Sequence, residues 1–246
     1  APALFMGGFY DCFLQGTINE FVGRQYSGGE GARGNNLLML GPWTHVNESS
    51  QLQGQLAYPE KSTLSLLDQL DIVLDWFNYW LKGDDNGIMD EDPVQYFLMG
   101  DPLARFAPGN FWESAKTWPP PHNEATLYLG RDGVLGPSPS AENVQPTSIS
   151  FDPSNPIPTV GGANLEIPAG PYNQLEIEAR EDVVTFTTDV LGEPLEVVGR
   201  IRAVVYASCN LSDMDLSVRL SDVYTNGASV LVSDGILRSS LRDGFD

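Results

Sequence analysis

The chain has 246 residues, of which 41% are hydrophobic and 10% aromatic, so it can bury a sizeable core and has the length of two domains. Its 13 basic and 33 acidic side chains give a formal net charge of −20. A field of this sign repels phosphate backbones and anionic membrane surfaces, and no apolar run approaches the roughly 18 residues of a membrane span. We therefore expect neither nucleic acid nor a membrane as a partner.

The first 42 residues are predicted to form a strand, a helix and a second strand. Ala3–Met6 is a short apolar run between Pro2 and two glycines, which suits a strand covered on both faces. Residues 13–26 carry a helical apolar stripe that ends at a Ser-Gly-Gly sequence, and Leu37–Leu40 is the next buried strand. This order of elements favours an α/β architecture.

Residues 64–82 are predicted to form a helix. Apolar side chains recur there at the i, i+3, i+4, i+7 spacing of an amphipathic helix. Ser62 or Thr63 can cap its start, and Gly83 stands where a glycine ends many helices.

The acidic run Asp84–Asp92 follows this helix. It superficially resembles a calcium-binding loop, but the ligand positions alternate wrongly and the closing glutamate is missing. We interpret the run as a solvated turn and predict no metal site. The two cysteines, Cys12 and Cys209, lie far apart and form neither a disulfide framework nor a zinc spacing, so the sequence leaves the compartment open.

Val94–Met99 is predicted to be a further strand, and a break with two tryptophans and three consecutive prolines follows it. The part of the chain beyond this break is predicted to be all-β, without a helix. Beyond the break, Tyr224–Gly227 between two alternating runs predicts a hairpin. Short runs of strand character recur between turn residues in this part of the chain. The strands that they predict are Ala125–Leu129, Ile149–Phe151, Val183–Thr188, Leu195–Ala207, Leu216–Tyr224 and Ser229–Val232. We expect an α/β domain over residues 1–122 and a β-sandwich of jelly-roll type over residues 123–246.

Two polar residues follow the buried strands directly. Asp11 comes after the first apolar strand, and His45 closes the sequence GPWTH after the second. An acid and then a histidine, each just past the carboxyl end of a strand, is the second half of the Ser, Asp, His chain order of α/β-hydrolases. Imidazole suits a general base because its charge changes near neutral pH, and a carboxylate fixes its tautomer. The sequence predicts that these side chains meet at one rim of the sheet.

Three short motifs resemble those of the CocE/NonD hydrolases, relatives of the Xaa-Pro dipeptidyl-peptidases. Gly8–Phe13 resembles their G-[WF]-Y-D-x-F segment, Gly41–His45 their G-P-W-[ST]-H segment, and Trp76–Gly83 their F-[FW]-D-x-x-L-K-G helix end. The motifs occur in family order, and the likeness extends over essentially the whole chain. It implies an acyl hydrolase with an α/β-hydrolase core, a helical cap and a jelly roll.

The resemblance also implies roles for individual residues. Asp11 would be the acid of a Ser-His-Asp triad, and His45 would be the general base. Phe13 would line the acyl pocket, although it equally suits a core aromatic at a helix start. The substrate would be a small ester, amide or peptide, and no cofactor is expected.

The nucleophilic serine of the family, on a G-x-S-x-x-G elbow, has no counterpart in this chain. We expect it on a missing upstream segment or a companion chain, together with the oxyanion donors, and we expect the jelly roll to lack its last strands. The chain alone should then be inactive. An isolated half-sheet exposes unpaired edges, so the missing part is also expected to cover Ala3–Met6 and Leu37–Leu40.

A second interpretation is a binding module without catalysis. The jelly roll would recognise carbohydrate or protein, with residues 1–115 as a scaffold, and Trp112, Trp118 and Tyr128 would form an aromatic platform. These aromatics fall at a domain junction, where burial is the ordinary expectation, so we favour the hydrolase.

Overall fold

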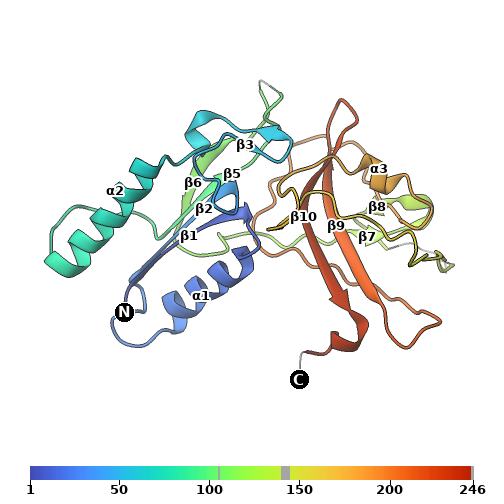
Figure 1. The fold of residues 1–246 in the computed structure, drawn as a ribbon, viewed down its shortest axis with the longest axis horizontal. Coiled ribbons are helices and arrows are strands. Elements are labelled where there is room, and N and C mark those ends of the chain that lie inside the picture. The colour runs from blue at the N-terminus through green and yellow to red at the C-terminus, as the bar shows by residue number, and fades with distance from the viewer. Residues whose placement is uncertain (105, 140–144, 245–246) are drawn as a thin grey trace.

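The computed structural model of the protein describes residues 1–104, 106–139 and 145–244. Figure 1 shows two lobes, a first lobe that runs to about residue 115 and a second lobe with the secondary structure from residue 128 onward. Within the described ranges, no helix combines the length and the apolar character needed to cross a membrane.

A four-stranded sheet forms the centre of the first lobe. It consists of β1 (Ala3–Tyr10), β2 (Asn36–Thr44), β5 (Val94–Leu98) and β6 (Phe111–Ala115), in the order β1-β2-β5-β6. The first three strands are parallel and β6 is antiparallel to β5. The three parallel strands confirm the sequence prediction, whereas β6 lies in a stretch that we interpreted only as a composition break.

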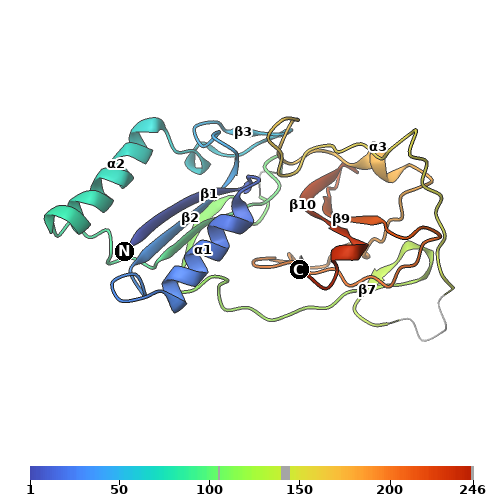
Figure 2. The ribbon, with the colours of Figure 1, turned by 60° about the horizontal axis from the view of Figure 1, so that its bottom comes forward.

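Helix α1 (Leu14–Ser27) covers one face of this sheet, as Figure 2 shows. Phe21 is fully buried and packs in one cluster with Leu38, Leu40 and Val94. These contacts confirm the predicted helical stripe. They also correct part of one expectation, because Leu38 and Leu40 are buried by α1 and β5 and need no missing segment to cover them.

Helix α2 (Leu66–Phe77) continues into a π-helical turn, η2 (Asn78–Lys82), and ends at Gly83, whose φ is +80°. Its start corrects the predicted cap. Ser65 accepts a hydrogen bond from the Asp68 N–H, and the Asp68 carboxylate accepts one from the Ser65 N–H, which makes a capping box. Ser62 is instead buried in the short turn η1 (Glu60–Ser62).

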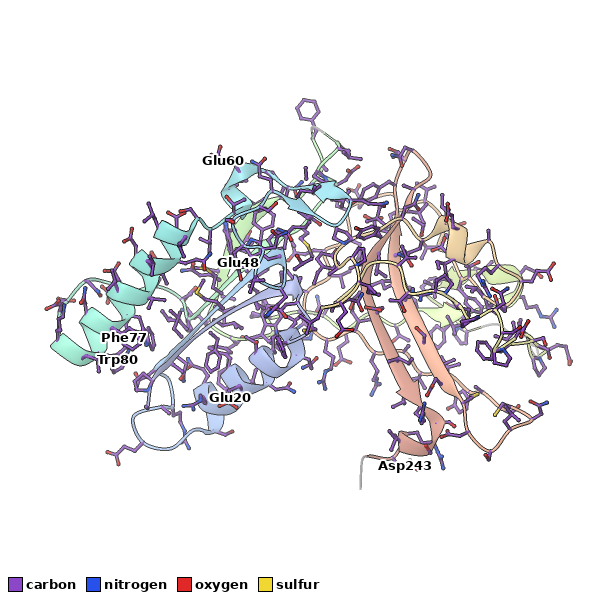
Figure 3. The ribbon with its side chains drawn as sticks, in the orientation of Figure 1. Glu20, Glu48, Glu60, Phe77, Trp80 and Asp243 are labelled. Atoms are coloured by element: carbon purple, nitrogen blue, oxygen red, sulfur yellow. The ribbon has the colours of Figure 1, made fainter. Side chains whose placement is uncertain are left out.

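The apolar face of α2 is largely open in this chain. Figure 3 labels Phe77 and Trp80 in the last part of the helix. The exposed apolar side chains of the whole element are Leu66, Leu67, Leu70, Leu74, Phe77 and Leu81. An amphipathic helix with this face uncovered is not a complete packing unit.

The second lobe is β-rich, with long irregular segments. Two-stranded sheets are formed by β7 (Tyr128–Leu129) with β8 (Leu135–Gly136) and by β9 (Asp215–Val223) with β10 (Ser229–Arg238). The predicted hairpin is confirmed: the Gly227 N–H donates to the Tyr224 carbonyl at 2.8 Å, and Gly227 has a φ of +86°.

Several predictions for the second lobe are wrong. Residues 149–151, 183–188 and 195–207 form no strand, because in the described part of the chain no neighbouring strand pairs with their backbone. Thr187 makes one isolated bridge to Val134. A short helix, α3 (Leu175–Glu178), lies where no helix was expected, and η3 (Arg131–Gly133) and η4 (Ser239–Leu241) are further turns.

The two lobes share a buried contact. Val230 of β10 packs in one cluster with Leu56, Tyr58 and Phe97 of the first lobe. The Tyr10 hydroxyl, at the end of β1, donates a hydrogen bond to the Leu231 carbonyl at 3.1 Å. The second lobe therefore packs directly behind the strand end that carries Asp11.

Candidate active site

A register shift in the sheet brings the ends of β1 and β2 level. Gly8 pairs with Gly41, but Tyr10 pairs with Thr44, so β2 carries one extra residue in this stretch. Pro42, which has no N–H to donate, is buried within the irregularity. Without the shift, Asp11 would stand opposite Thr44. With the shift, Asp11 stands level with His45, the first residue after β2.

The structure brings Asp11 and His45 together. Nδ1 of His45 lies 3.0 Å from Oδ2 of Asp11 across a sequence separation of 34 residues. The Asp11 side chain is 12% exposed and that of His45 37%. A carboxylate oxygen only accepts a hydrogen bond, so Nδ1 must carry the proton, and in the neutral ring the lone pair is then on Nε2.

The second oxygen of Asp11 is also held. Oδ1 accepts a hydrogen bond from the Phe13 N–H at 2.8 Å, and the Asp11 carbonyl accepts one from the Leu14 N–H at 3.0 Å as α1 begins. The turn into α1 thus fixes the plane of the carboxylate, and the carboxylate fixes the imidazole. Among the described residues, Nε2 of His45 has no hydrogen-bond partner.

Phe13 lies beside the histidine instead of in the core. Its ring is 5.2 Å from that of His45, with an interplanar angle of 67°, and it is 56% exposed. The core-aromatic alternative is therefore wrong. An edge-to-face ring in this position limits the directions in which the imidazole can turn.

The loop after His45, which Glu48 marks in Figure 3, returns into a short hairpin of β3 (Leu52–Gln53) and β4 (Leu56–Ala57). Gln53 is fully buried, and its side-chain amide bonds to Thr44, Asn47 and Ser50. Sequence reasoning missed Gln53, since a glutamine between Leu52 and Gly54 carries no recognisable signal.

Close packing behind the pair explains two glycines. A Cβ on Gly8 would lie 2.0 Å from the Trp43 carbonyl oxygen, and one on Gly41 would lie 2.2 Å from the Trp43 ring. Trp43 is buried, and its indole N–H donates to the Ser62 carbonyl at 2.7 Å. The strand ends therefore rest on a large, fixed side chain.

Other polar residues stay apart from this pair. His122 is exposed and bonds through Nδ1 to the Pro120 carbonyl at 2.7 Å. Cys12 and Cys209 are both free and exposed. Over the residues that the structure describes, no group of three or more His, Cys, Asp or Glu side chains could hold a metal ion.

The aromatic platform of the binding-module interpretation does not form. Trp118 is buried against Tyr96 and Phe9, and Trp112 packs against Trp43. Two of the three proposed rings thus belong to the packing of the first lobe.

The fold and the site define a chain in which an acid–histidine pair stands on the ends of parallel strands, joined to a β-rich lobe. The family described as the X-Pro dipeptidyl-peptidase C-terminal non-catalytic domain matches residues 86–246. The chain belongs to this family. Asp11 and His45 lie before the matched range.

Individual relatives cover nearly all of the chain. The cocaine esterase of Rhodococcus sp. (strain MB1 Bresler) is 29% identical over 98% of this chain and 42% of its own length. The solved structure of an α-amino acid ester hydrolase covers 98% of this chain and 41% of its own, with 23% identity and a TM-score of 0.74. The chain therefore spans less than half the length of these relatives.

These comparisons confirm the resemblance to the CocE/NonD hydrolases. The first of these relatives is named as an esterase and the second as an ester hydrolase. The solved structure supports the fold, including the β-rich second lobe.

Proposed function

We propose that this chain supplies the acid and the general base of a serine acyl hydrolase that cleaves an ester, amide or peptide bond. Asp11 is the acid and His45 the base, and the nucleophilic serine lies on a segment outside this chain. The observation that carries the proposal is the 3.0 Å contact between His45 Nδ1 and Asp11 Oδ2 at two adjacent strand ends. The division into an α/β-hydrolase domain over 1–122 and a jelly roll over 123–246 is part of the same proposal.

The reaction follows from the protonation states. Nε2 of His45 takes the proton of the serine hydroxyl while the serine oxygen bonds to the substrate carbonyl carbon. The imidazolium, stabilised by Asp11, then gives this proton to the leaving alcohol or amine as its bond to carbon breaks. Water attacks the acyl-enzyme, His45 accepts its proton and returns one to the serine oxygen, and the carboxylic acid leaves.

Phe13 is proposed to contact the acyl group of the substrate. Its ring is exposed and stands against the imidazole at 5.2 Å. An apolar wall beside the base also limits the access of water to the reacting atoms. The oxyanion donors belong, in this proposal, to the serine-bearing segment.

The open surfaces of the first lobe support a missing partner segment. β1 is an edge strand of the sheet, and a parallel edge leaves backbone N–H and C=O groups without a neighbour. On the sheet face away from α1, Leu4 and Leu37 are only partly buried, and the apolar face of α2 is open. We propose that the serine-bearing segment covers these surfaces, and that this chain alone is inactive.

The test is a substitution of the base in the complete protein that contains this chain. His45→Ala is expected to lower kcat on p-nitrophenyl acetate by about 10³- to 10⁶-fold, because removing the base of a triad removes most of its rate enhancement. His122→Ala is the matched control and should keep full activity. Equal turnover by the wild type and His45→Ala would refute the assignment.

A further inference from the structure

We propose that Gln53 is a positioning residue for His45, acting through the loop of residues 44–50. The proposal rests on the proposed function, because it assigns a support to the base of that same site. Gln53 is 0% exposed and so cannot touch substrate. Its effect must pass through the backbone that carries the imidazole.

The side-chain amide of Gln53 binds the loop at both ends. Oε1 accepts from the Thr44 N–H at 2.8 Å, the Thr44 hydroxyl at 3.1 Å and the Asn47 side-chain amide at 3.2 Å. Nε2 donates to the carbonyls of Asn47 at 2.9 Å and Ser50 at 2.8 Å. One buried group thereby ties the residue before His45 to two residues after it.

The loop needs such a support because its backbone is strained. Val46, directly after His45, has a φ of +52°, and a β-branched residue rarely adopts this conformation. The Val46 side chain is 77% exposed, so packing does not hold it there. Strained residues of this kind persist where the surrounding contacts over-determine them, and the Gln53 amide supplies these contacts on both sides.

Gln53 is itself fixed from the second lobe. In the tight turn after it, Gly54 has a φ of +56°, and a Cβ there would lie 2.7 Å from the Pro171 carbonyl oxygen. The Gln55 N–H donates to that carbonyl at 2.9 Å, and Oε1 of Gln55 accepts from the Asn173 N–H at 2.8 Å. The β3–β4 hairpin is therefore held between the histidine loop and the second lobe.

The expected consequence is a loss of rate without a loss of substrate affinity. Misplacing a catalytic group by about 1 Å can cost about 100-fold in rate. Gln53→Met keeps the length and the packing of the side chain but removes all five hydrogen bonds. In the complete protein, we expect kcat on p-nitrophenyl acetate to fall about 10- to 100-fold while KM stays within about twofold.

A second readout separates positioning from general stability. Hydrogen–deuterium exchange of peptides covering residues 41–52 should become faster in Gln53→Met, below the unfolding temperature of both proteins. Labelling of the nucleophile by a fluorophosphonate should slow in parallel with kcat.

The matched control is Asn36→Ala. Asn36 is also a fully buried amide, stands on the same strand β2, and bonds to Gln25 and Ala32 at the opposite end from His45. It should lower the unfolding temperature without changing kcat or the exchange of residues 41–52. Wild-type kcat in Gln53→Met, or an equal kcat loss in Asn36→Ala, would overturn the proposal. His45→Ala tests the proposed function separately, because the role of His45 as general base does not depend on whether Gln53 positions it.

Discussion

At the scale of single residues, Asp11 uses its two carboxylate oxygens for two different tasks. Oδ2 accepts a hydrogen bond from the Nδ1–H of His45, while Oδ1 accepts one from the Phe13 N–H at the start of α1. The backbone bond fixes the direction in which the carboxylate points, so the imidazole is oriented by an acid that cannot swing away. An amide in place of this carboxylate keeps the shape of the side chain. Its NH₂ group donates hydrogen bonds, however, so Nδ1 facing it would have to accept a hydrogen bond instead of donating one.

We therefore expect Asp11→Asn to lower kcat by about 10³- to 10⁴-fold with little change in unfolding temperature, because the amide no longer fixes the productive tautomer. The measurement is steady-state ester hydrolysis by the complete protein, with thermal denaturation alongside. Asp84→Asn, an exposed acid in the turn after η2, is the control and should behave as the wild type. Full activity in Asp11→Asn would remove Asp11 from the mechanism.

At the scale of elements, the irregular parts of the backbone position the site residues as much as the regular strands do. The extra residue of β2 between Gly41 and Thr44 sets the level of His45, and the β3–β4 hairpin returns Gln53 beneath it.

In the second lobe, the end of β10 is joined to the start of β9 through Asp213. Its carboxylate accepts hydrogen bonds from the Ser239 hydroxyl at 2.5 Å and from the Ser240 N–H and hydroxyl at 2.9 and 2.7 Å.

This carboxylate predicts a pH dependence of stability. The hydroxyls of Ser239 and Ser240 hold the pKa of Asp213 well below its usual range. A group with a lowered pKa in the folded state stabilises the fold above its unfolded pKa of about 4, and this contribution is lost as the pH falls further. We expect Asp213→Asn to lower the unfolding temperature at pH 7, and the difference from the wild type to shrink below about pH 4.

The measurement is a set of thermal melts between pH 7 and pH 3. Asp189→Asn is the control, because Asp189 is exposed and has no hydrogen-bond partner among the described residues, and it should follow the wild type throughout. A difference between Asp213→Asn and the wild type that grows as the pH falls would contradict the assigned role of the Asp213 carboxylate.

At the scale of the whole molecule, the two lobes are joined through a buried contact and not only by the connecting chain. Val230 packs against Leu56, Tyr58 and Phe97, and the Tyr10 hydroxyl reaches Leu231. Burial raises the pKa of Tyr10 far above its usual range, so this hydroxyl stays a donor at any ordinary pH. The second lobe should therefore stabilise the first.

Val230→Ala is expected to lower the free energy of unfolding by about 1–3 kcal/mol, since two buried methyl groups and their packing are lost. All five tryptophans lie between residues 43 and 118, so their fluorescence reports the first lobe. We expect the tryptophan-monitored midpoint of the 246-residue chain in denaturant to fall. Val190→Ala, at a 98% exposed position, should leave it unchanged. A normal midpoint in Val230→Ala would mean that the lobes unfold independently.

The sequence by itself determined the features that depend on local pattern. The strands at Ala3–Met6 and Leu37–Leu40, the helices that follow each of them and the Tyr224–Gly227 hairpin all form, because hydrophobic period and turn residues act over a few positions. Asp11 and His45 could be found for the same reason, since each directly follows a strand. Propensity failed over residues 195–207, where a strand requires a neighbour that the local pattern does not supply.

Only the tertiary structure decided how these parts meet. The register shift that brings His45 level with Asp11 depends on the packing of Gly8 and Gly41 against Trp43. The buried Gln53, the open face of α2 and the contact of Val230 with the first lobe likewise arise between segments far apart in sequence. Local propensity carries no information on such contacts, because their free energy appears only when distant surfaces are buried together.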